Sequence, residues 1–277
     1  MENELKETVR EVCSAAEKLK INVVLVGALM AQYTLELGSD YPKFRGTNDA
    51  DFGVSVRDWE SFKKLHEELL ARDFKANPKI EHRLHRGATM VDLIPYGSQI
   101  APDGKLTWPE SGFEMTVTGF DEVCAAARKA DQSNDPSLPV ITVPGFVLLK
   151  IIAFLDRRAR HDPKHRDDGK DIEYWLRNFA SGTDDARRFD WAGQSGLAHE
   201  DYETAGAVLL GVEVGKLASP EAAVYVDRFM KESEDLYSPF MDALAAGQHE
   251  EAADKKRRDG LALLAAFKKG YAHGGCA

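Results

Sequence analysis

The sequence predicts an α+β protein, in which a mixed β-sheet flanked by helices is followed by an α-helical C-terminal region. Strand-like runs and amphipathic helices alternate in the front half, whereas from residue 144 onward apolar residues recur mainly at helical spacing. A polar, proline-containing stretch at residues 132–139 separates the two patterns. We therefore predict an α/β domain at residues 1–135 and a helical domain at residues 136–277.

In the front half, the expected elements follow from hydrophobic spacing and from turn residues. Apolar positions three and four apart predict a first helix, and Asp58 is a suitable N-cap for another. Arg86-Gly87 is a turn that joins two strands of a hairpin. The strands are expected at residues 23–26, 52–56, 80–85, 88–94 and 113–117, and the helices at residues 2–20, 28–37, 59–72 and 121–130.

In the back half, almost every expected element is a helix. Residues 140–143 form a last strand or the extended approach that Pro144 imposes on the residues before it. Pro144-Gly145 then starts a strongly apolar helix, and the basic, polar run of residues 157–170 follows it. Further helices are expected at residues 171–179, 184–194, 200–216, 219–236 and 249–270.

The composition is that of a globular protein in a reducing compartment. Of the 277 residues, 43% are hydrophobic and 30% are charged. No run approaches the roughly 20 apolar residues that a membrane-spanning helix needs, and the charged N-terminus lacks the apolar core of a signal peptide. The three cysteines form neither a zinc-binding pattern nor a disulfide framework. We expect a cytoplasmic protein without membrane contact.

The net charge limits the kinds of partner. A formal net charge of −10 argues against broad, nonspecific binding of nucleic acid, and no DNA partner is expected. A local basic groove is still compatible with this charge, because a partner responds to the local field rather than to the sum.

Gly27 and three aspartates are the candidate site of the front half. Gly27 follows the first strand and Asp49 and Asp51 open the second, where the alternation of side chains puts both carboxylates on one face. Two neighbouring carboxylates repel each other, and a hard cation with oxygen ligands removes the repulsion. Asp92 interrupts an apolar strand, where an ionised carboxylate is costly unless it is paired or binds metal. The three aspartates therefore predict a Mg²⁺ site; the alternative for Asp49 and Asp51 alone is a capped strand end.

The order G-A, R-G-T-N-D-A-D and V-D-L-I resembles the nucleotidyltransferase superfamily of the DNA polymerase β type, and most of all its minimal and AbiEii-toxin-like members. The resemblance covers roughly residues 20–180 and implies a nucleotidyltransferase-like sheet. It implies that Asp49 and Asp51 bind two Mg²⁺ or Mn²⁺ ions. Asp92, the third carboxylate, would bind the catalytic ion and assist deprotonation of the acceptor, and Gly27 would cradle the triphosphate.

Three neighbouring residues belong to the expected nucleotide site. Where family members carry a second Gly or a Ser, this chain has Ala28, whose backbone N–H can still donate to a phosphate although the hydroxyl is missing. Arg45 contacts the triphosphate or stabilises the acidic cluster. Thr47 bonds a phosphate or caps the strand turn.

Lys150 and Asp168 are the candidates of the back half. Lys150 interrupts an apolar helix face, and AbiEii-like proteins carry a helix lysine followed by a D-x-x-D run, which Asp168 and Asp171 resemble. By that resemblance Lys150 would meet the nucleotide phosphates and Asp168 would orient basic groups or take part in the chemistry. The alternative is a solvated charged face capped by Asp167 or Asp168.

The activity that the resemblance implies is transfer of a nucleoside monophosphate from an NTP to an acceptor hydroxyl, with release of pyrophosphate. The acceptor would be RNA, such as a tRNA end, and the protein would be a toxin with an antitoxin protein as partner. One alternative is an antibiotic nucleotidyltransferase that modifies a small, cationic aminoglycoside, for which an acidic cleft is suitable. Another is a nucleotide-binding module that keeps the fold and no longer transfers.

Overall fold

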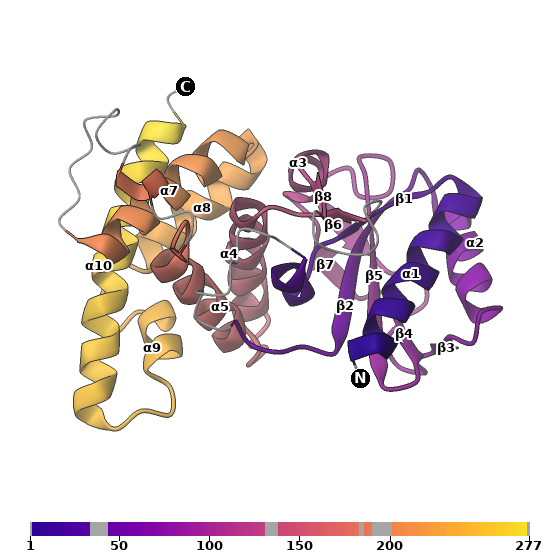
Figure 1. The fold of residues 1–277 in the computed structure, drawn as a ribbon, viewed down its shortest axis with the longest axis horizontal. Helices are drawn as coiled ribbons and strands as arrows, with labels where there is room; N and C mark the ends of the chain where they lie inside the picture. Colours follow the sequence, from indigo (N-terminus) through magenta and orange to yellow (C-terminus); the bar gives the residue numbers. More distant parts are fainter. Residues whose placement is uncertain (1, 34–43, 131–137, 183–185, 190–200, 276–277) are drawn as a thin grey trace. The chain divides into compact units, whose positions relative to one another are not determined.

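The computed structural model describes residues 2–33, 44–130, 138–182, 186–189 and 201–275 (Figure 1). Its chain forms two compact units, which are described separately. The first consists of Met1–Leu35 and Phe44–Thr142, and the second of Glu36–Lys43 and Val143–Ala277. The boundary predicted at residues 135/136 lies outside the described residues. An α+β protein with a mixed sheet and a helical C-terminal region is what the sequence predicted, and the structure confirms this.

The first unit is built on a mixed sheet with the strand order β3-β4-β5-β2-β1-β9-β8. Its central strands β2 and β5 are parallel, as are β1 and β9, and the other pairs are antiparallel. A separate hairpin joins β6 and β7. The strands are β1 Asn22–Leu25, β2 Asp49–Ser55, β3 Lys75–Ala76, β4 Arg83–Arg86, β5 Thr89–Tyr96, β6 Lys105–Thr107, β7 Glu114–Thr116, β8 Arg128–Lys129 and β9 Pro139–Val140.

The two central strands differ from the predicted ones at their ends. Strand β2 begins at Asp49, three residues before the predicted start, because residues 49–51 already pair with β5. Strand β5 continues through Pro95, which was expected to end it. Proline is tolerated there because β4 pairs only with residues 89–92, so the missing N–H interrupts no ladder on that side.

Two amphipathic helices pack against each other beside this sheet, α1 Glu2–Leu19 and α2 Trp59–Leu70 (Figure 1). Their buried faces carry leucine, valine and phenylalanine at helical spacing, as predicted. Asp58 caps α2, since its side chain accepts a hydrogen bond from the backbone N–H of Ser61 at 2.7 Å. An ion pair between Glu11 of α1 and Arg72, just after the end of α2, links the two segments.

Two predicted helices of the first unit are shorter than expected. Of residues 28–37, Ala28–Gln32 form a 3₁₀ helix, η1, and residues 34–37 lie outside the described part of the chain. The helix expected at residues 121–130 is α3 Phe120–Ala125, and it ends early because Arg128–Lys129 leave it to pair with β9. That backbone pairing is a tertiary effect which helix periodicity does not report.

The second unit is entirely helical over its described residues. Its helices are α4 Val143–Ala159, α5 His165–Asn178, α7 Tyr202–Leu217, α8 Pro220–Glu232, α9 Pro239–Ala245 and α10 Glu250–Gly274, with a further short helical segment at residues 186–189. Helix α5 begins six residues before its predicted start, and α9 was not predicted. The signal for α9 was present, because Ser238 caps it and Pro239 occupies its first turn.

Close backbone contact and aromatic packing hold these helices together. Helices α7 and α10 lie side by side (Figure 1). A Cβ atom at Gly270 of α10 would lie 1.9 Å from the carbonyl oxygen of Val208 in α7, so only glycine permits this approach. The rings of Phe154, Phe229 and Phe240 meet edge to face between α4, α8 and α9.

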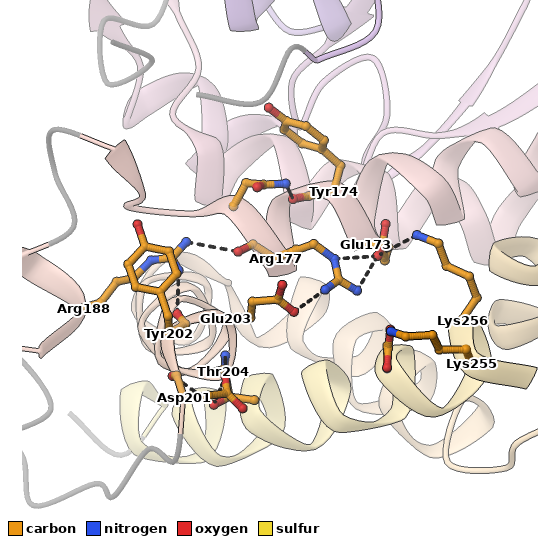
Figure 2. A network of polar contacts seen from close by, with 12 residues as sticks. Glu173, Tyr174, Arg177, Arg188, Asp201, Tyr202, Glu203, Thr204, Lys255 and Lys256 are labelled. Atoms are coloured by element: carbon orange, nitrogen blue, oxygen red, sulfur yellow. Dashed lines mark hydrogen bonds and ion pairs between the residues drawn. The ribbon is translucent and has the colours of Figure 1, made fainter. Parts of the chain in front are cut away.

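A polar network connects α5 with α7 and α10 at the surface of the second unit (Figure 2). Glu173 of α5 accepts hydrogen bonds from Arg177 of the same helix and from Lys256 of α10. Arg177 also pairs with Glu203 of α7. Lys256 thus shares the Glu173 carboxylate with Arg177.

No helix in the described ranges is long and apolar enough to cross a membrane.

Candidate functional site

The first unit gathers the three predicted aspartates on one face of its sheet. Strands β2 and β5 pair in parallel with Asp51 directly beside Asp92, and neighbouring strands lie about 4.8 Å apart. Asp49 is two residues before Asp51, so its side chain points to the same face. All three are half-buried, whereas Ala50 and Phe52, which alternate with Asp49 and Asp51 along β2, are buried on the opposite face. The register thus produces an acidic cluster of Asp49, Asp51 and Asp92.

Arg83 lies at the edge of this acidic cluster. Strand β4 pairs with β5 so that Arg83 stands opposite Asp92. The guanidinium donates from Nε to Oδ1 and from Nη2 to Oδ2 of Asp92, both at 2.7 Å. This is the bidentate geometry in which an arginine binds a carboxylate most strongly.

The pKa of Arg83 reflects the charges of all three aspartates in the acidic cluster. Its pKa is raised above the ordinary value, first by the hydrogen bonds to Asp92 and then by the charges of Asp92, Asp49 and Asp51, against the opposing effect of burial. One guanidinium therefore interacts with three carboxylates. The residue was missed in the sequence, because a turn at Arg86-Gly87 would put position 83 opposite position 90. In the structure the turn is Gly87-Ala88 and Arg86 still belongs to β4, and this shift of one residue places Arg83 opposite Asp92.

Gly27 touches the acidic cluster at the end of β1. The backbone N–H of Val26 donates to the carbonyl oxygen of Asp51 at 2.8 Å, which holds the two strands together at this point. A Cβ atom on Gly27 would lie 1.7 Å from Oδ2 of Asp51. The φ of Gly27 is −86°, which any residue adopts, so glycine is needed for the close approach and not for the backbone conformation.

The other predicted nucleotide residues of this unit lie around the ends of β1 and β2. Ala28 is buried at the start of η1. The side-chain oxygen of Thr47 accepts a hydrogen bond from the backbone N–H of Asp49 at 3.0 Å, so Thr47 does cap the strand turn. Arg45 is exposed, and its guanidinium lies 5.7 Å from the ring centre of Phe44. Their predicted contacts with phosphate stay predictions.

The acidic cluster suits a hard divalent cation by the chemistry of its donors, since carboxylate oxygens are the ligands that Mg²⁺ and Mn²⁺ prefer. Asp92 already accepts two hydrogen bonds from Arg83, but an ionised carboxylate offers about four lone-pair sites and can serve more than one partner. Within the described residues, no three His, Cys, Asp or Glu side chains converge as a ready-made metal site.

Lys150 and Asp168 belong to the second unit, where they form a buried ionic cluster between α4 and α5. The ammonium of Lys150 lies 2.8 Å from Asp168 Oδ1 and 2.8 Å from Asp171 Oδ2. Arg157, about two turns further along the same side of α4, donates to both oxygens of Asp168 at 2.5–2.6 Å. The side chains of Asp168 and Asp171 are 0% and 2% exposed, and that of Lys150 is 17% exposed.

For Asp168 and Asp171, burial overturns the alternative of a solvated, capping face, whereas Asp167 and its basic neighbours Lys164, Arg166 and Lys170 are exposed. The residue that caps α5 is Lys164, without a side-chain hydrogen bond. Asp168 and Asp171 lie three residues apart, which turns both toward α4. The buried pairs also explain why α5 starts at His165, because a loop at residues 165–170 would not hold Asp168 against its partners.

The two carboxylates set the charge state of Lys150. Burial by itself disfavours the ammonium, but the charges of Asp168 and Asp171 and their hydrogen bonds outweigh it, so the pKa of Lys150 is raised. Lys150 is therefore a permanent cation at neutral pH. Its predicted contact with nucleotide phosphates stays a prediction, as does a chemical role for Asp168.

The comparison with protein-family models gave no match, and no curated protein matches the chain.

Proposed function

We propose that this protein is a divalent-metal-dependent nucleotidyltransferase, which moves a nucleoside monophosphate from an NTP to an acceptor hydroxyl and releases pyrophosphate. The observation that supports it most is the strand register that sets Asp51 beside Asp92, on the face that Asp49 shares. Acidic residues at neighbouring positions of two strands are a costly arrangement for stability alone, because like charges raise the free energy of the folded state.

In this proposal, Asp49, Asp51 and Asp92 hold Mg²⁺ or Mn²⁺, which when bound would neutralise the phosphates and activate the acceptor hydroxyl. The chain's own groups hold the reactants. Arg83 fixes the orientation of the Asp92 carboxylate, which is the group proposed to receive the proton of the acceptor hydroxyl. Gly27, without a side chain, makes room for the Asp51 carboxylate at the end of β1. Gly27 and the backbone N–H of Ala28 are proposed to cradle the triphosphate.

Lys150 of the second unit is proposed as a phosphate ligand on different grounds. Its ammonium stays charged because two buried carboxylates raise its pKa, and a permanent cation is suited to a polyphosphate. Asp168 holds both Lys150 and Arg157, so it would act by positioning these cations. In the first unit, Arg45 and Thr47 are proposed as ligands of the triphosphate.

The acceptor is proposed to be RNA, with a tRNA end as the first case to test, and the physiological partner an antitoxin protein. The alternative acceptor is a small cationic molecule of the aminoglycoside class, which the acidic cluster and the net charge of −10 favour electrostatically. Both acceptors would receive the nucleoside monophosphate on a hydroxyl group, so a single labelling assay can test them side by side.

The first prediction tests the transfer itself. The protein is incubated with each α-³²P-labelled NTP, Mg²⁺ or Mn²⁺, and either total RNA or a panel of aminoglycosides, and the products are separated on a gel or a thin layer. Wild-type protein is expected to label a discrete RNA. Asp49→Asn and Asp51→Asn are expected to reduce the labelled product at least about a hundredfold. Loss of a residue that only supports a metal ligand already lowers activity by about 10–100-fold, and loss of the ligand itself should lower it further.

Asp103→Asn is the matched control, since Asp103 is an exposed aspartate of the same unit. Its transfer rate should equal that of the wild type, and circular dichroism should show all three variants folded. Retained transfer in Asp49→Asn or Asp51→Asn would contradict the proposed mechanism. Binding of NTP without transfer to any acceptor would instead favour the nucleotide-binding module.

A further inference from the structure

We infer that Arg83 is a built-in counter-ion of the acidic cluster, which pairs with Asp92 in the absence of a divalent cation and competes with the cation for that carboxylate. This inference deepens the proposed function, on whose metal site it rests. It assigns to Arg83 the control of metal affinity through its charge, and Arg83 does not itself meet the substrate.

The geometry puts Arg83 where a cation would bind. Both oxygens of Asp92 accept from the guanidinium at 2.7 Å, so the fork covers the carboxylate edge that a metal ion would also use. Asp51 stands directly beside Asp92 in the neighbouring strand. His82 Nε2, at 3.9 Å from Asp92 Oδ2, is a further group near the same oxygen.

The charges explain why the pair exists. Three carboxylates on one sheet face repel one another, and the pairing with Arg83 offsets part of that repulsion. The Arg83 and Asp92 side chains are only 17% and 15% exposed, so water screens their charges weakly. The same cluster that attracts a divalent cation therefore already attracts one internal positive charge.

A divalent cation on Asp92 and Asp51 would lie within a few ångströms of the guanidinium. The two positive charges repel, and this repulsion lowers the affinity of the cluster for the metal. Removal of the charge at position 83 should therefore tighten metal binding. The opposite result is expected if Arg83 merely keeps Asp92 in the right rotamer, since the loss of that support would weaken binding.

The second prediction measures Mn²⁺ affinity directly, without NTP. The loss of the free Mn²⁺ signal in electron paramagnetic resonance is followed for wild type, Arg83→Gln and Arg83→Lys. Arg83→Gln is expected to bind Mn²⁺ about tenfold more tightly than the wild type, because it keeps a hydrogen-bond donor and loses the charge. Arg83→Lys keeps the charge and loses the fork, so a change of less than about threefold is expected.

Arg86→Gln is the matched control. Arg86 lies on the same strand, but it pairs with Glu7 of α1 and its position points to the other face of the sheet. The substitution removes the same charge from the chain and should leave the Mn²⁺ affinity unchanged. An equal increase in Mn²⁺ affinity in Arg86→Gln and Arg83→Gln would overturn the inference, because the change in the net charge of the protein would then explain the increase.

Thermal unfolding provides a second readout, and it also shows whether each variant is folded. Arg83→Gln leaves Asp92 without its arginine, so the metal-free variant should melt below wild type, and saturating Mn²⁺ should raise its melting temperature more than that of wild type. If Arg83→Gln does not fold even with Mn²⁺, Arg83→Lys decides the question. Weaker Mn²⁺ binding by the folded variants, or none by wild type and variants alike, would overturn the inference.

Failure of the proposed function is distinguishable from failure of this inference. Tighter Mn²⁺ binding in Arg83→Gln together with no labelled product from any NTP would support the counter-ion and refute the transferase. Labelled product from the wild type together with unchanged or weaker Mn²⁺ binding in Arg83→Gln would support the transferase and refute the counter-ion.

Discussion

At the scale of single residues, Gly27 shows that a glycine can be required by its neighbour and not by its own backbone. The sequence suggested a glycine that cradles phosphate. In the structure its φ of −86° is ordinary, and the missing side chain is what lets the Asp51 carboxylate lie against the end of β1. The constraint on Gly27 is therefore a constraint on the position of Asp51.

The third prediction tests this contact with Gly27→Ala. The added methyl would lie 1.7 Å from Asp51 Oδ2, so either the carboxylate or the strand end must move. We expect a loss of about 1–3 kcal/mol in the free energy of unfolding, as for an overpacked site, and weaker Mn²⁺ binding in the same variant. Urea unfolding and the Mn²⁺ titration measure the two effects.

Gly46→Ala is the control for this experiment, because a Cβ atom there meets nothing within 4 Å. Its free energy of unfolding should stay within about 0.5 kcal/mol of wild type. Unchanged stability and unchanged Mn²⁺ affinity in Gly27→Ala would mean that the Asp51 carboxylate has another position of equal free energy.

At the scale of elements, strand register and helix pairing bring together residues that are far apart in the chain. The β4–β5 hairpin puts Arg83 opposite Asp92, and the parallel β2–β5 pair puts Asp92 beside Asp51. In the second unit, α4 and α5 meet through Lys150, Arg157 and Asp168. Each of these contacts depends on the pairing of two strands or two helices.

The fourth prediction concerns the buried ions between α4 and α5. Asp168→Asn leaves Lys150 and Arg157 with less compensating charge inside the unit, and removal of one partner from a buried pair costs about 3–5 kcal/mol. Because the Arg157 side chain is 33% exposed and can regain water, we expect about 2–3 kcal/mol by urea unfolding at pH 7. Asp167→Asn, one residue earlier and exposed, should change stability by less than about 0.5 kcal/mol.

The pH dependence of this cluster has a definite sign. The pKa of Lys150 is raised above 10.5 in the folded protein, so the folded protein binds the proton of Lys150 more tightly than the unfolded chain does. The contribution to stability is fully present below pH 10.5 and is lost as the pH rises through the raised value. The difference between wild type and Lys150→Met should hence be constant from pH 7 to 9; a steep change within that range would contradict the pairing.

At the scale of the whole molecule, the chain consists of two compact units, each with its own buried core. Leu65 in the core of the first and Leu210 in the core of the second are both 0% exposed. Such leucines lose about 2–5 kcal/mol on truncation to alanine. A core of this kind is commonly a cooperative unit of its own.

The fifth prediction uses this pair of leucines as probes for hydrogen exchange measured by mass spectrometry. Leu65→Ala is expected to speed exchange in peptides of residues 44–142, and Leu210→Ala in peptides of residues 202–274. Each variant serves as the control of the other. An equal rise along the whole chain in both variants would mean that the protein unfolds as one cooperative unit.

The sequence alone determined the α+β class, the helical back half and most elements, because these depend on local signals. Periods of two and of about 3.6 residues and the Asp58 cap are legible without a partner. The hairpin turn was also legible, but it was predicted one residue too early, since Arg86 belongs to β4 and the turn is Gly87-Ala88. Asp49 and Asp51 share a face for the same reason, since alternation along one strand needs no tertiary information. Two of the errors lie where a distant partner intervened: backbone pairing with β9 ends α3 early, and buried side-chain ion pairs accompany the early start of α5. The local signal of α9 was present and was missed.

Tertiary structure alone decided which of these residues meet. Arg83 had no local signal of function, and it became part of the acidic cluster through the register of two strand pairs. Lys150 looked like a free phosphate ligand on an apolar helix, and the packing of α5 gave it two buried carboxylates. Burial, pairing and close approach are properties of neighbours across the fold, and periodicity within one element does not report them.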